Sequence, residues 1–438
     1  MAEQDYDIIQ AILNELPAGA QPLVREMYGR LDKEQRAAAQ GFLENATRYL
    51  GLPETKRLLE IIREQYAPAF AGPRRVCIVG PVNSGKSSLY NALLTTKDNR
   101  AVTSPVPGTT KEAQEGIAGI LTIIDTPGAD DVEIGLEGDE AGAHRREVAL
   151  NAARQADLLL LVFDASVGIT RSALEIYQEL TSLGKPYVVA LNKMDLVKRE
   201  QNQVIELAAR TLGLDAGQII PTSATRGTNL ERLVIALARA NPELLATLGV
   251  ALPAFRDRLA TEQIRNAVIA AGTVNLATSP IPVPFASFVP LTAIQGGLVL
   301  SLGRLYGYPI NVARARELVT TFGAGFGART LFQQLVTKVP GPGWVLGTAI
   351  AAATTAAIGF AAQAWFGRGE RISQEALRHV IDEITRRTVR SFKRFGKKQP
   401  DKQRAGEAIV RSVDGLLPSV HPSQTMEALD DPTIHDSE

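Results

Sequence analysis

The segment from Gly80 to Ser87 constrains the fold of this chain more than any other part of the sequence. It reads G-P-V-N-S-G-K-S and matches the phosphate-binding pattern G-x-x-x-x-G-K-[ST] without a gap. That pattern needs a strand before it and a helix after it, and the sequence predicts a strand over 75–79 and a helix over 88–94. The glycines let backbone N–H groups turn inward, and the helix N-terminus adds a positive dipole. We therefore expect a phosphate-binding loop here.

The polar side chains of this loop are expected to bind different parts of a nucleotide complex. The ammonium group of Lys86 is expected to reach the β- and γ-phosphates of a nucleotide, and the hydroxyl of Ser87 to bind Mg²⁺. The alternative is a glycine-rich loop that arises by chance, which the flanking strand and helix disfavour. The residues expected to contact the phosphates are Gly80, Asn83, Ser84, Gly85, Lys86, Ser87 and Ser88.

Short apolar runs alternate with amphipathic helices between residues 73 and 247. Runs that are apolar throughout suit strands buried on both faces, as in a mostly parallel sheet covered by helices. The sequence thus predicts an α/β domain of three layers built around the phosphate-binding loop. The runs lie at 76–79, 121–124, 158–163, 187–191 and 219–220.

A second motif, Asn192-Lys193-Met194-Asp195, follows one of these strands. A carboxylate at position 195 can accept hydrogen bonds from N1–H and the exocyclic amine of guanine, whereas adenine offers no such pair of donors. The motif alone is also compatible with a plain turn between a strand and a helix. Its place roughly 100 residues after the phosphate-binding loop favours base recognition. The residues expected to contact guanine are Asn192, Lys193, Asp195, Ser223, Ala224 and Thr225.

Two further segments contain residues suited to a magnesium ion and a γ-phosphate. Asp125 ends an apolar strand and is expected to hold Mg²⁺ through water, while the backbone N–H of Gly128 suits contact with the γ-phosphate. Thr109 and Thr110 lie in a Pro-Gly-Thr-Thr segment, and a threonine there can close over Mg²⁺ in the triphosphate state only. The alternative for both threonines is a solvated loop.

These five segments, in this order, resemble the translation-factor-related class of GTPases, and within it the Era and TrmE group, over roughly residues 73–240. The resemblance implies GTP or GDP as the ligand, Mg²⁺ as the metal ion, and Thr110 rather than Thr109 as the Mg²⁺ ligand. It also implies that Asn83 ligates a K⁺ ion, the alternative being that Asn83 only shapes the loop. Relatives that depend on K⁺ often dimerise through their GTPase domains, so a nucleotide-dependent homodimer is an expected partner.

The sequence contains no evident residue to orient the attacking water. Ala129 follows Gly128, at the place where Ras-type GTPases have a glutamine. The acidic, glycine-rich stretch at 129–142 suggests a mobile switch, and each of its carboxylates either orients water or is a solvated loop charge. These carboxylates are Glu133, Glu137, Asp139 and Glu140. We expect slow intrinsic hydrolysis, accelerated by K⁺, self-association or a partner, with Lys86, Thr110 and Gly128 acting on the γ-phosphate.

Helices are predicted for most of the chain outside this domain. With 438 residues the chain is long enough for two or three domains. Residues 1–72 are expected to form a helical region, either a small bundle or an arm packed on its neighbours. Residues 248–395 are expected to form an all-α apolar domain that ends in a basic helix. Residues 396–438 are polar and are expected to be disordered.

Charge and cysteine content bear on the binding partners and the cellular compartment of the protein. The formal net charge is zero, so the charge of the whole molecule favours neither nucleic acid nor an acidic substrate. Cys77 is the only cysteine, which excludes intramolecular disulfides and a thiolate zinc cluster and fits a reducing cytoplasm. The first residues are acidic and polar and do not resemble a secretory signal. We therefore expect a cytoplasmic protein that is not secreted.

Two uncharged stretches in the C-terminal half are long enough to enter a bilayer. Four prolines interrupt the first, at 266–303, so one spanning helix is not expected there. The second, at 344–365, is rich in alanine and near the threshold for a spanning helix, and such helices also pack closely within soluble bundles. The region resembles family 697 of the domains of unknown function, which occurs attached to Era-like GTPases and in predicted inner-membrane proteins. The stretches that carry this resemblance are 282–306 and 323–347.

The basic helix expected over 371–395 suits an anionic membrane surface, the alternative being a helix packed on its domain with a solvated basic face. No KH signature follows the α/β domain, so nucleic acid is the less expected partner. The leading hypothesis is a GTP-hydrolysing switch coupled to a membrane-associated or membrane-embedded helical domain. The alternatives are a cytosolic GTPase in ribosome or RNA maturation and a nucleotide-dependent scaffold with little turnover.

Overall fold

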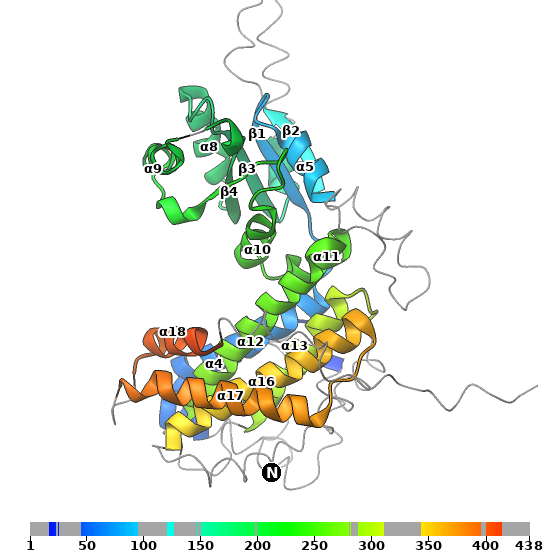
Figure 1. Cartoon of the computed structure of the whole chain (residues 1–438), viewed down its shortest axis with the longest axis vertical. Coiled ribbons are helices and arrows are strands. Elements are labelled where there is room, and N and C mark those ends of the chain that lie inside the picture. Colours follow the sequence, from blue (N-terminus) through cyan, green and yellow to red (C-terminus); the bar gives the residue numbers. More distant parts are fainter. Residues whose placement is uncertain are drawn as a thin grey trace, which may run out of the picture. The chain divides into compact units, whose positions relative to one another are not determined.

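The chain divides into two compact units, which are described separately (Figure 1). The nucleotide-binding unit, as we call it below, consists of Ala71–Leu259. The helical unit combines Met1–Phe70 with Ala260–Glu438. The computed structural model describes residues 17–22, 25, 45–94, 121–126, 147, 150–197, 199–279, 281, 288–310, 343–395 and 400–413.

The nucleotide-binding unit is built on a five-stranded sheet in the order β2-β1-β3-β4-β5. Every neighbouring pair of these strands is parallel. From β1 the chain moves to β2 on one side and then to β3 on the other. The carboxyl end of β1 is therefore a topological switch point, where open α/β sheets bind ligands. The strands are β1 (Val76–Pro81), β2 (Leu121–Thr126), β3 (Leu158–Asp164), β4 (Tyr187–Asn192) and β5 (Ile219–Pro221).

Local sequence signals set the ends of the helices around this sheet. The hydroxyl of Thr170 accepts a hydrogen bond from the backbone N–H of Ala173 at 3.2 Å and so caps the start of α8. Gly213, in the left-handed conformation with φ 69°, ends α9. The elements are α5 (Lys86–Leu94), α8 (Arg171–Thr181), η3 (Met194–Leu196), α9 (Gln201–Leu212), η4 (Ala216–Gln218), α10 (Leu230–Ala240), α11 (Leu244–Ala251) and η5 (Pro253–Phe255).

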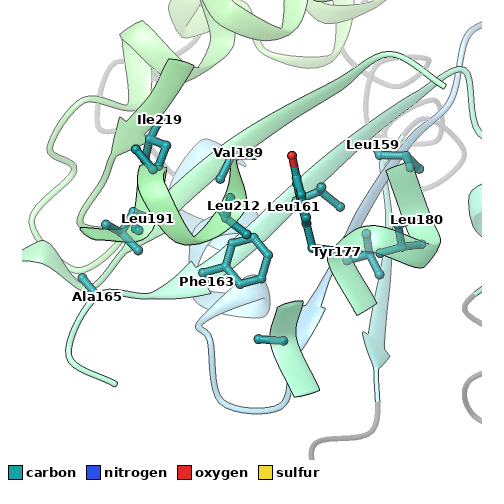
Figure 2. Close-up of a cluster of buried hydrophobic side chains, with 14 of the residues drawn as sticks. Leu159, Leu161, Phe163, Ala165, Tyr177, Leu180, Val189, Leu191, Leu212 and Ile219 are labelled. Carbon is teal, nitrogen blue, oxygen red and sulfur yellow. The ribbon is translucent and has the colours of Figure 1, made fainter. Parts of the chain in front are cut away.

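Alternate strand residues fill a hydrophobic core against α8 and α9 (Figure 2). Leu159, Leu161 and Phe163 of β3 lie in this core together with helix residues such as Tyr177 and Leu212. The intervening residues of β3 are buried as well, so this strand is covered on both faces. A strand covered in this way is typical of a parallel sheet between two helical layers. The structure thus confirms the predicted α/β fold with a mostly parallel sheet.

The described part of the helical unit consists of helices packed around α16 (Figure 1). Among the described residues, α16 is the helix that is long and apolar enough to cross a membrane, judged by length and composition alone. Its most apolar 18-residue window is 94% buried in the unit, as in the core helix of a folded domain. The helices are α4 (Leu52–Phe70), α12 (Arg256–Thr278), α13 (Phe288–Leu305), α16 (Gly343–Arg368), α17 (Gln374–Lys393) and α18 (Lys402–Val413).

Glycines allow these helices to approach one another closely. A Cβ atom at Gly359 of α16 would lie 2.7 Å from Cγ1 of Ile264 in α12. A Cβ atom at Gly297 of α13 would lie 3.0 Å from the backbone carbonyl carbon of Gln65 in α4. The hydroxyl of Ser301 in α13 donates to the backbone oxygen of Gln65 at 2.8 Å. Helix α4, from the region preceding the sheet, therefore packs on helices that follow the sheet in sequence.

The helix α18 corrects one part of the sequence prediction. It occupies Lys402–Val413, within the range 396–438 that is predicted to be a disordered tail. Ala405, Ala408 and Ile409 recur at helical spacing and are fully buried. Burial of this apolar stripe against α17 stabilises a helix whose overall composition is polar.

The uncharged stretch at 266–303 contributes to two helices rather than one. α12 ends at Thr278 and α13 begins at Phe288. Pro290 lies in the first turn of α13, where backbone N–H groups have no intrahelical partner and proline is tolerated. The predicted limits of the regions stay predictions. The limit at residue 247 falls inside α11, and residues from 414 onward lie outside the described residues.

Candidate nucleotide-binding site

The predicted phosphate-binding loop is the turn between β1 and α5. Its backbone is left-handed at Asn83 (φ 61°) and Gly85 (φ 87°), a conformation that asparagine and glycine adopt at the least cost. A Cβ atom at Gly85 would lie 2.4 Å from Nδ2 of Asn192, and one at Gly80 would lie 2.1 Å from the backbone oxygen of Val162. Both glycines are therefore required by the close approach of residues from β3 and β4.

Lys86, the first residue of α5, points its ammonium group back toward the end of β1. Nζ donates hydrogen bonds to the backbone oxygens of Gly80 at 2.8 Å and Pro81 at 2.6 Å, and the residue is only 2% exposed. Carbonyl dipoles compensate a buried ammonium group less well than an anion does. The loop therefore holds a buried cation beside the predicted place of the nucleotide phosphates.

The polar side chains of the loop differ in their burial. Ser84 is 1% exposed, and its Oγ has no hydrogen-bond partner among the described residues. Asn83, Ser87 and Ser88 are exposed. A buried hydroxyl without a partner is uncommon in proteins and fits a loop that is completed by a polar ligand. The hydroxyl of Ser87 lies at the N-terminus of α5 and is accessible for its predicted role toward Mg²⁺.

Further residues of the site come from the carboxyl ends of neighbouring strands. In the sheet Asp125 of β2 pairs with Gly80, and Asp164 of β3 pairs with Asn192 of β4. Because parallel strands end at the same edge, these residues and the phosphate-binding loop lie along one side of the sheet. The backbone of Asp125 is described and its side chain is not, so its contact with Mg²⁺ stays a prediction.

Asn192 joins the phosphate-binding loop to the loop that follows β5. The residue is 1% exposed, and its Nδ2 donates to the backbone oxygens of Ser84 at 3.1 Å and Gly85 at 3.4 Å. Its Oδ1 accepts from the backbone N–H of Ala224 at 3.1 Å and from the hydroxyl of Thr222 at 3.5 Å. One buried amide thus fixes the position of the predicted phosphate-binding residues relative to the predicted base-binding residues.

Asp195 is held as an ionised hydrogen-bond acceptor. Its carboxylate accepts from the hydroxyl of Ser223 at 2.6 Å and from that of Thr225 at 3.2 Å. The bond from Ser223 is the main reason why the pKa of Asp195 lies below its usual value, and the bond from Thr225 adds to it. Ser223 is oriented in turn by the backbone N–H of Arg226, which donates to its Oγ at 3.2 Å. The structure therefore brings together the phosphate-binding loop, the loop of Asp195 and the loop of Ser223, three of the five predicted segments.

Asp164, at the carboxyl end of β3, is a site residue that the sequence analysis missed. Its carboxylate accepts from Nζ of Lys193 at 2.7 Å and from the backbone N–H and hydroxyl of Ser166 at 2.8 and 2.6 Å. Burial alone would raise the pKa of Asp164, but the bonds from Lys193 and Ser166 outweigh it and lower that pKa. Lys193 is itself left-handed with φ 61°. A carboxylate that ends a buried strand beside the strand of Asn192 is the sequence signal that could have found it.

Several predicted residues lie outside the described residues. They are Thr109, Thr110, Gly128, Glu133, Glu137, Asp139 and Glu140. Among the described residues, no group of three or more His, Cys, Asp or Glu side chains could hold a metal ion. Ligation of Mg²⁺ by Ser87, Thr110 and Asp125, and of K⁺ by Asn83, therefore stays a prediction.

Comparison with known proteins identifies the domain. Residues 75–193 match the sequence model of a family described as 50S ribosome-binding GTPase. The chain is 36% identical to GTPase Der from Symbiobacterium thermophilum over 173 residues, which are 39% of this chain and 35% of Der. It is 35% identical to the tRNA modification GTPase MnmE from Picosynechococcus sp. over 170 residues, which are 37% of this chain and 34% of MnmE. It is 34% identical to GTPase Era from Aquifex aeolicus over 177 residues, which are 38% of this chain and 56% of Era.

The chain thus contains a GTPase domain of the Era, Der and MnmE type, and it spans between about a third and just over half of these relatives. Among solved structures, a probable GTP-binding protein engB is 26% identical, with a TM-score of 0.29, and the match covers 39% of this chain and 99% of engB. Era in complex with MgGDPNP and a segment of 16S ribosomal RNA is 25% identical, with a TM-score of 0.27, covering 45% and 67%. The fold assignment rests on the parallel sheet of this chain.

Proposed function

We propose that this chain binds GTP, hydrolyses it to GDP and phosphate, and acts as a molecular switch. The observation that carries this proposal is the Asn192 amide, which ties the phosphate-binding loop to the loop of Ser223 and Ala224. A single buried side chain thereby places a cationic phosphate site and an anionic acceptor, Asp195, in one fixed arrangement. That arrangement suits a ligand with a polyphosphate at one end and a guanine at the other.

The chemistry assigned to the residues follows from their charges and positions. Water attacks the γ-phosphorus while the bond from phosphorus to the β–γ bridging oxygen breaks, which leaves GDP and inorganic phosphate. The ammonium group of Lys86 is suited to neutralise negative charge that develops on the β- and γ-phosphate oxygens. When bound, Mg²⁺ would further neutralise these oxygens, and Ser87, Thr110 and Asp125 are the residues proposed to hold it. Asn83 is proposed to hold K⁺.

Guanine selectivity is assigned to Asp195. Because its pKa is lowered, the carboxylate is ionised at neutral pH and acts only as an acceptor. Guanine presents two donors, N1–H and the exocyclic amine, whereas adenine presents an acceptor at N1. We therefore expect the chain to bind GTP and GDP and to reject ATP.

Phosphate release from GTP by the purified 438-residue chain tests this activity. The rate is measured with Mg²⁺ in KCl and in NaCl of equal concentration, with ATP as the alternative substrate. GTP turnover that exceeds ATP turnover supports the proposal, and faster turnover in KCl supports the role of Asn83. Tight GDP binding without turnover in either salt would instead favour a nucleotide-dependent scaffold. Sedimentation with GDP, and with a non-hydrolysable GTP analogue, tests the proposed homodimer.

We further propose that the helical unit associates with the cytoplasmic face of a membrane. Support comes from the exposed basic side chains of α17, and the burial of α16 favours contact by the surface of the unit over spanning. The neighbouring α17 carries exposed charged residues along its length, which a bilayer interior would penalise. Fractionation of expressing cells separates the cases, because salt releases a surface-bound protein and carbonate does not release a spanning one.

A cytosolic role on the ribosome is the second candidate, favoured by the matching family description. Era, a relative of the domain, has been crystallised with 16S ribosomal RNA, and we extend that property to this chain only as a hypothesis. Sedimentation of cell extract through sucrose, with GDP and with a non-hydrolysable GTP analogue, provides the test. Nucleotide-dependent recovery with ribosomal particles, together with absence from the membrane fraction, would favour this candidate.

A further inference from the structure

A row of cations lines the C-terminal half of α17. From residue 386 onward every exposed side chain of this helix is basic, and the residue that caps it is basic as well. At 3.6 residues per turn, these four positions fall within about 100° of the helix circumference. No ion pair of 4.0 Å or less joins any of them to an acidic side chain among the described residues, and the one acidic group that interacts with the row at longer range, Glu383 with Arg386, is already paired with Arg387. We call this set the cationic row: Arg386, Arg390, Lys393 and Arg394.

Basic residues close to the row are neutralised, which sets the row apart. Arg387, the neighbour of Arg386, is half-buried and pairs with Glu383, with 2.7 Å between its Nε and the Glu383 Oε1. On α18 both exposed arginines have acidic partners. These pairs are Arg404 with Asp401 at 3.4 Å and Arg411 with Glu407 at 3.7 Å.

The row faces away from α16 and α18, the two helices that pack against α17. Contact with α18 is made through Thr388, whose hydroxyl lies 3.0 Å from that of Ser412, and through Ser391, whose hydroxyl donates to the backbone oxygen of Ala408 at 3.0 Å. At 100° per residue Thr388 lies opposite to the middle of the row, and Ser391 lies about 60° beyond Arg394, outside the row. The described helices of the unit therefore leave the cationic row open to a partner.

Aromatic residues lie at the end of the row. Trp344, at the start of α16, meets the buried ring of Phe392 edge-on, with 5.8 Å between ring centroids. Phe392 contacts Phe395 at the same centroid distance, and the guanidinium of Arg394 lies 4.8 Å from the centroid of Phe395. Trp344 and Phe395 are half-buried. Cations beside half-buried tryptophan and phenylalanine are typical of surfaces that lie at lipid headgroups.

We propose that the cationic row of α17 is the face by which the helical unit binds an anionic lipid surface. The inference rests on the proposed membrane association and adds the docking face and the headgroup chemistry, namely phosphate and carboxylate groups. Lipid is favoured over nucleic acid because the aromatic rings beside the row are engaged with one another and with a cation: Phe392 is buried, Trp344 meets it edge-on and Arg394 lies over Phe395. In this arrangement α16 remains inside the unit.

The test is flotation of the 438-residue chain with vesicles of phosphatidylcholine in which about one lipid in three is phosphatidylserine, compared with pure phosphatidylcholine. One cation near an anionic membrane strengthens binding by roughly fivefold. The double variant Arg386→Gln/Arg390→Gln is therefore expected to bind the anionic vesicles about 25-fold more weakly than the unmodified chain. The matched control Arg404→Gln/Arg411→Gln loses the same charge from paired arginines and is expected to bind within about twofold of the unmodified chain.

The outcomes separate this inference from the proposals on which it rests. Equal binding by the two double variants, or equal binding to neutral vesicles, would show that the row is not the docking face while leaving membrane association intact. Failure of the unmodified chain to float with either vesicle would overturn both. Loss of binding to ribosomal RNA in the row variant, without any flotation of the unmodified chain, would assign the row to nucleic acid and also overturn the inference. GTP hydrolysis by each variant, together with circular dichroism, reports on the fold independently.

Discussion

The two compact units differ in what most of their described polar contacts join. In the nucleotide-binding unit the Asn192 amide bonds to Ser84, which is 108 residues away in sequence, and so joins separate segments. In the helical unit the hydroxyl of Ser301 bonds across to Gln65 of another helix, but several other buried hydroxyls bond back to their own helix. Thr354 donates to the backbone oxygen of Ile350 at 2.8 Å, and Thr278 donates to that of Val274 at 2.9 Å. Such bonds satisfy the hydroxyl without connecting one helix to another.

The contacts of the two units constrain different properties. Long-range polar bonds at the carboxyl edge of the sheet fix the geometry of a site, because each acceptor needs its donor at one distance and direction. Close glycine contacts between helices fix only how near two apolar surfaces come. We therefore expect polar substitutions in the first unit to change ligand recognition, and size changes in the second to change stability.

The largest effect is expected from Lys86→Ala. Removal of the buried ammonium leaves the developing charge on the β- and γ-phosphates without its main protein cation, and GTP hydrolysis should fall by a factor on the order of 10³. Phosphate release at saturating GTP measures this change. Lys185→Ala, which removes a lysine before β4, serves as the control and should retain its rate. Undiminished hydrolysis in Lys86→Ala would contradict the assignment of the phosphate-binding loop.

The next effect is a change of base specificity in Asp195→Asn. An amide replaces one acceptor with a donor, so affinity for GDP should fall by about 100-fold, while xanthine, with a carbonyl in place of the amine, should gain affinity. Fluorescence titration with labelled GDP and XDP measures both. Equal weakening toward both nucleotides would mean that Asp195 supports the loop instead of reading the base.

A stability effect confined to the helical unit is expected from Gly359→Val. The added side chain would overlap Ile264 and should destabilise the packing of α16 on α12 by about 1–3 kcal/mol. Gly343→Val provides the matched control at the exposed start of α16, where a Cβ atom meets nothing within 4 Å. Hydrogen exchange of the helical unit, read beside GDP affinity, measures the effect. If the free energy of GDP binding fell by as much as the free energy of unfolding, the effect would not be confined to the helical unit, and the proposed difference between the units would be wrong.

The smallest effect is expected from Asp164→Asn. The substitution removes the charge that holds Lys193, so GDP affinity should fall by about tenfold or less without a change in base preference. Glu200→Gln, at an exposed carboxylate before α9 with no capping bond, is the control for charge alone. Titration with GDP and XDP distinguishes this variant from Asp195→Asn, and a switch of preference toward XDP would contradict the positioning role.

Low pH should remove the charges of the same two carboxylates, Asp164 and Asp195, in the unmodified chain. Asp164 and Asp195 both have folded pKa values below the ordinary carboxyl value near 4. Their contribution to folding is therefore fully present above that value and is lost as the pH falls through the lowered folded values. The contribution of these two carboxylates to the free energy of unfolding is expected to stay constant from about pH 8 to pH 5 and to fall below about pH 4, as acid unfolding followed by circular dichroism measures. A decline centred near pH 6 would point to another group.

The sequence predicts the sheet and the candidate site well because each motif combines chemistry with position. A motif that follows a buried strand must lie at the carboxyl edge, so the loops of Lys86, Asp195 and Ser223 meet as expected. The bond between Asp164 and Lys193 was missed because it joins two strand ends that carry no shared pattern. Predicted residues such as Thr110 lie outside the described residues and are not tested.

The helical unit was less predictable for a physical reason. An apolar stripe specifies that a helix is buried but not which other helix covers it, since apolar contacts have no direction. The packing of Gln65 in α4 against Ser301 in α13, 236 residues apart, is therefore not encoded in a local pattern. α18 could have been predicted more easily. The apolar stripe of Ala405, Ala408 and Ile409 is visible in the sequence, but its polar neighbours lower the average hydrophobicity of the segment.

The bridging position of Asn192 also bears on how the protein is made. The partners of its amide belong to the loop after β1 and to the loop after β5, so the site is incomplete until the last strand of the sheet has been synthesised and paired. A nascent chain that ends before β5 should hold the phosphate-binding loop without the contact from Ala224 that secures the amide. Nucleotide binding then stabilises the finished sheet and no earlier stage, since a ligand favours only the state that binds it. Guanine nucleotide in the cell would thus stabilise only those molecules in which the sheet is complete.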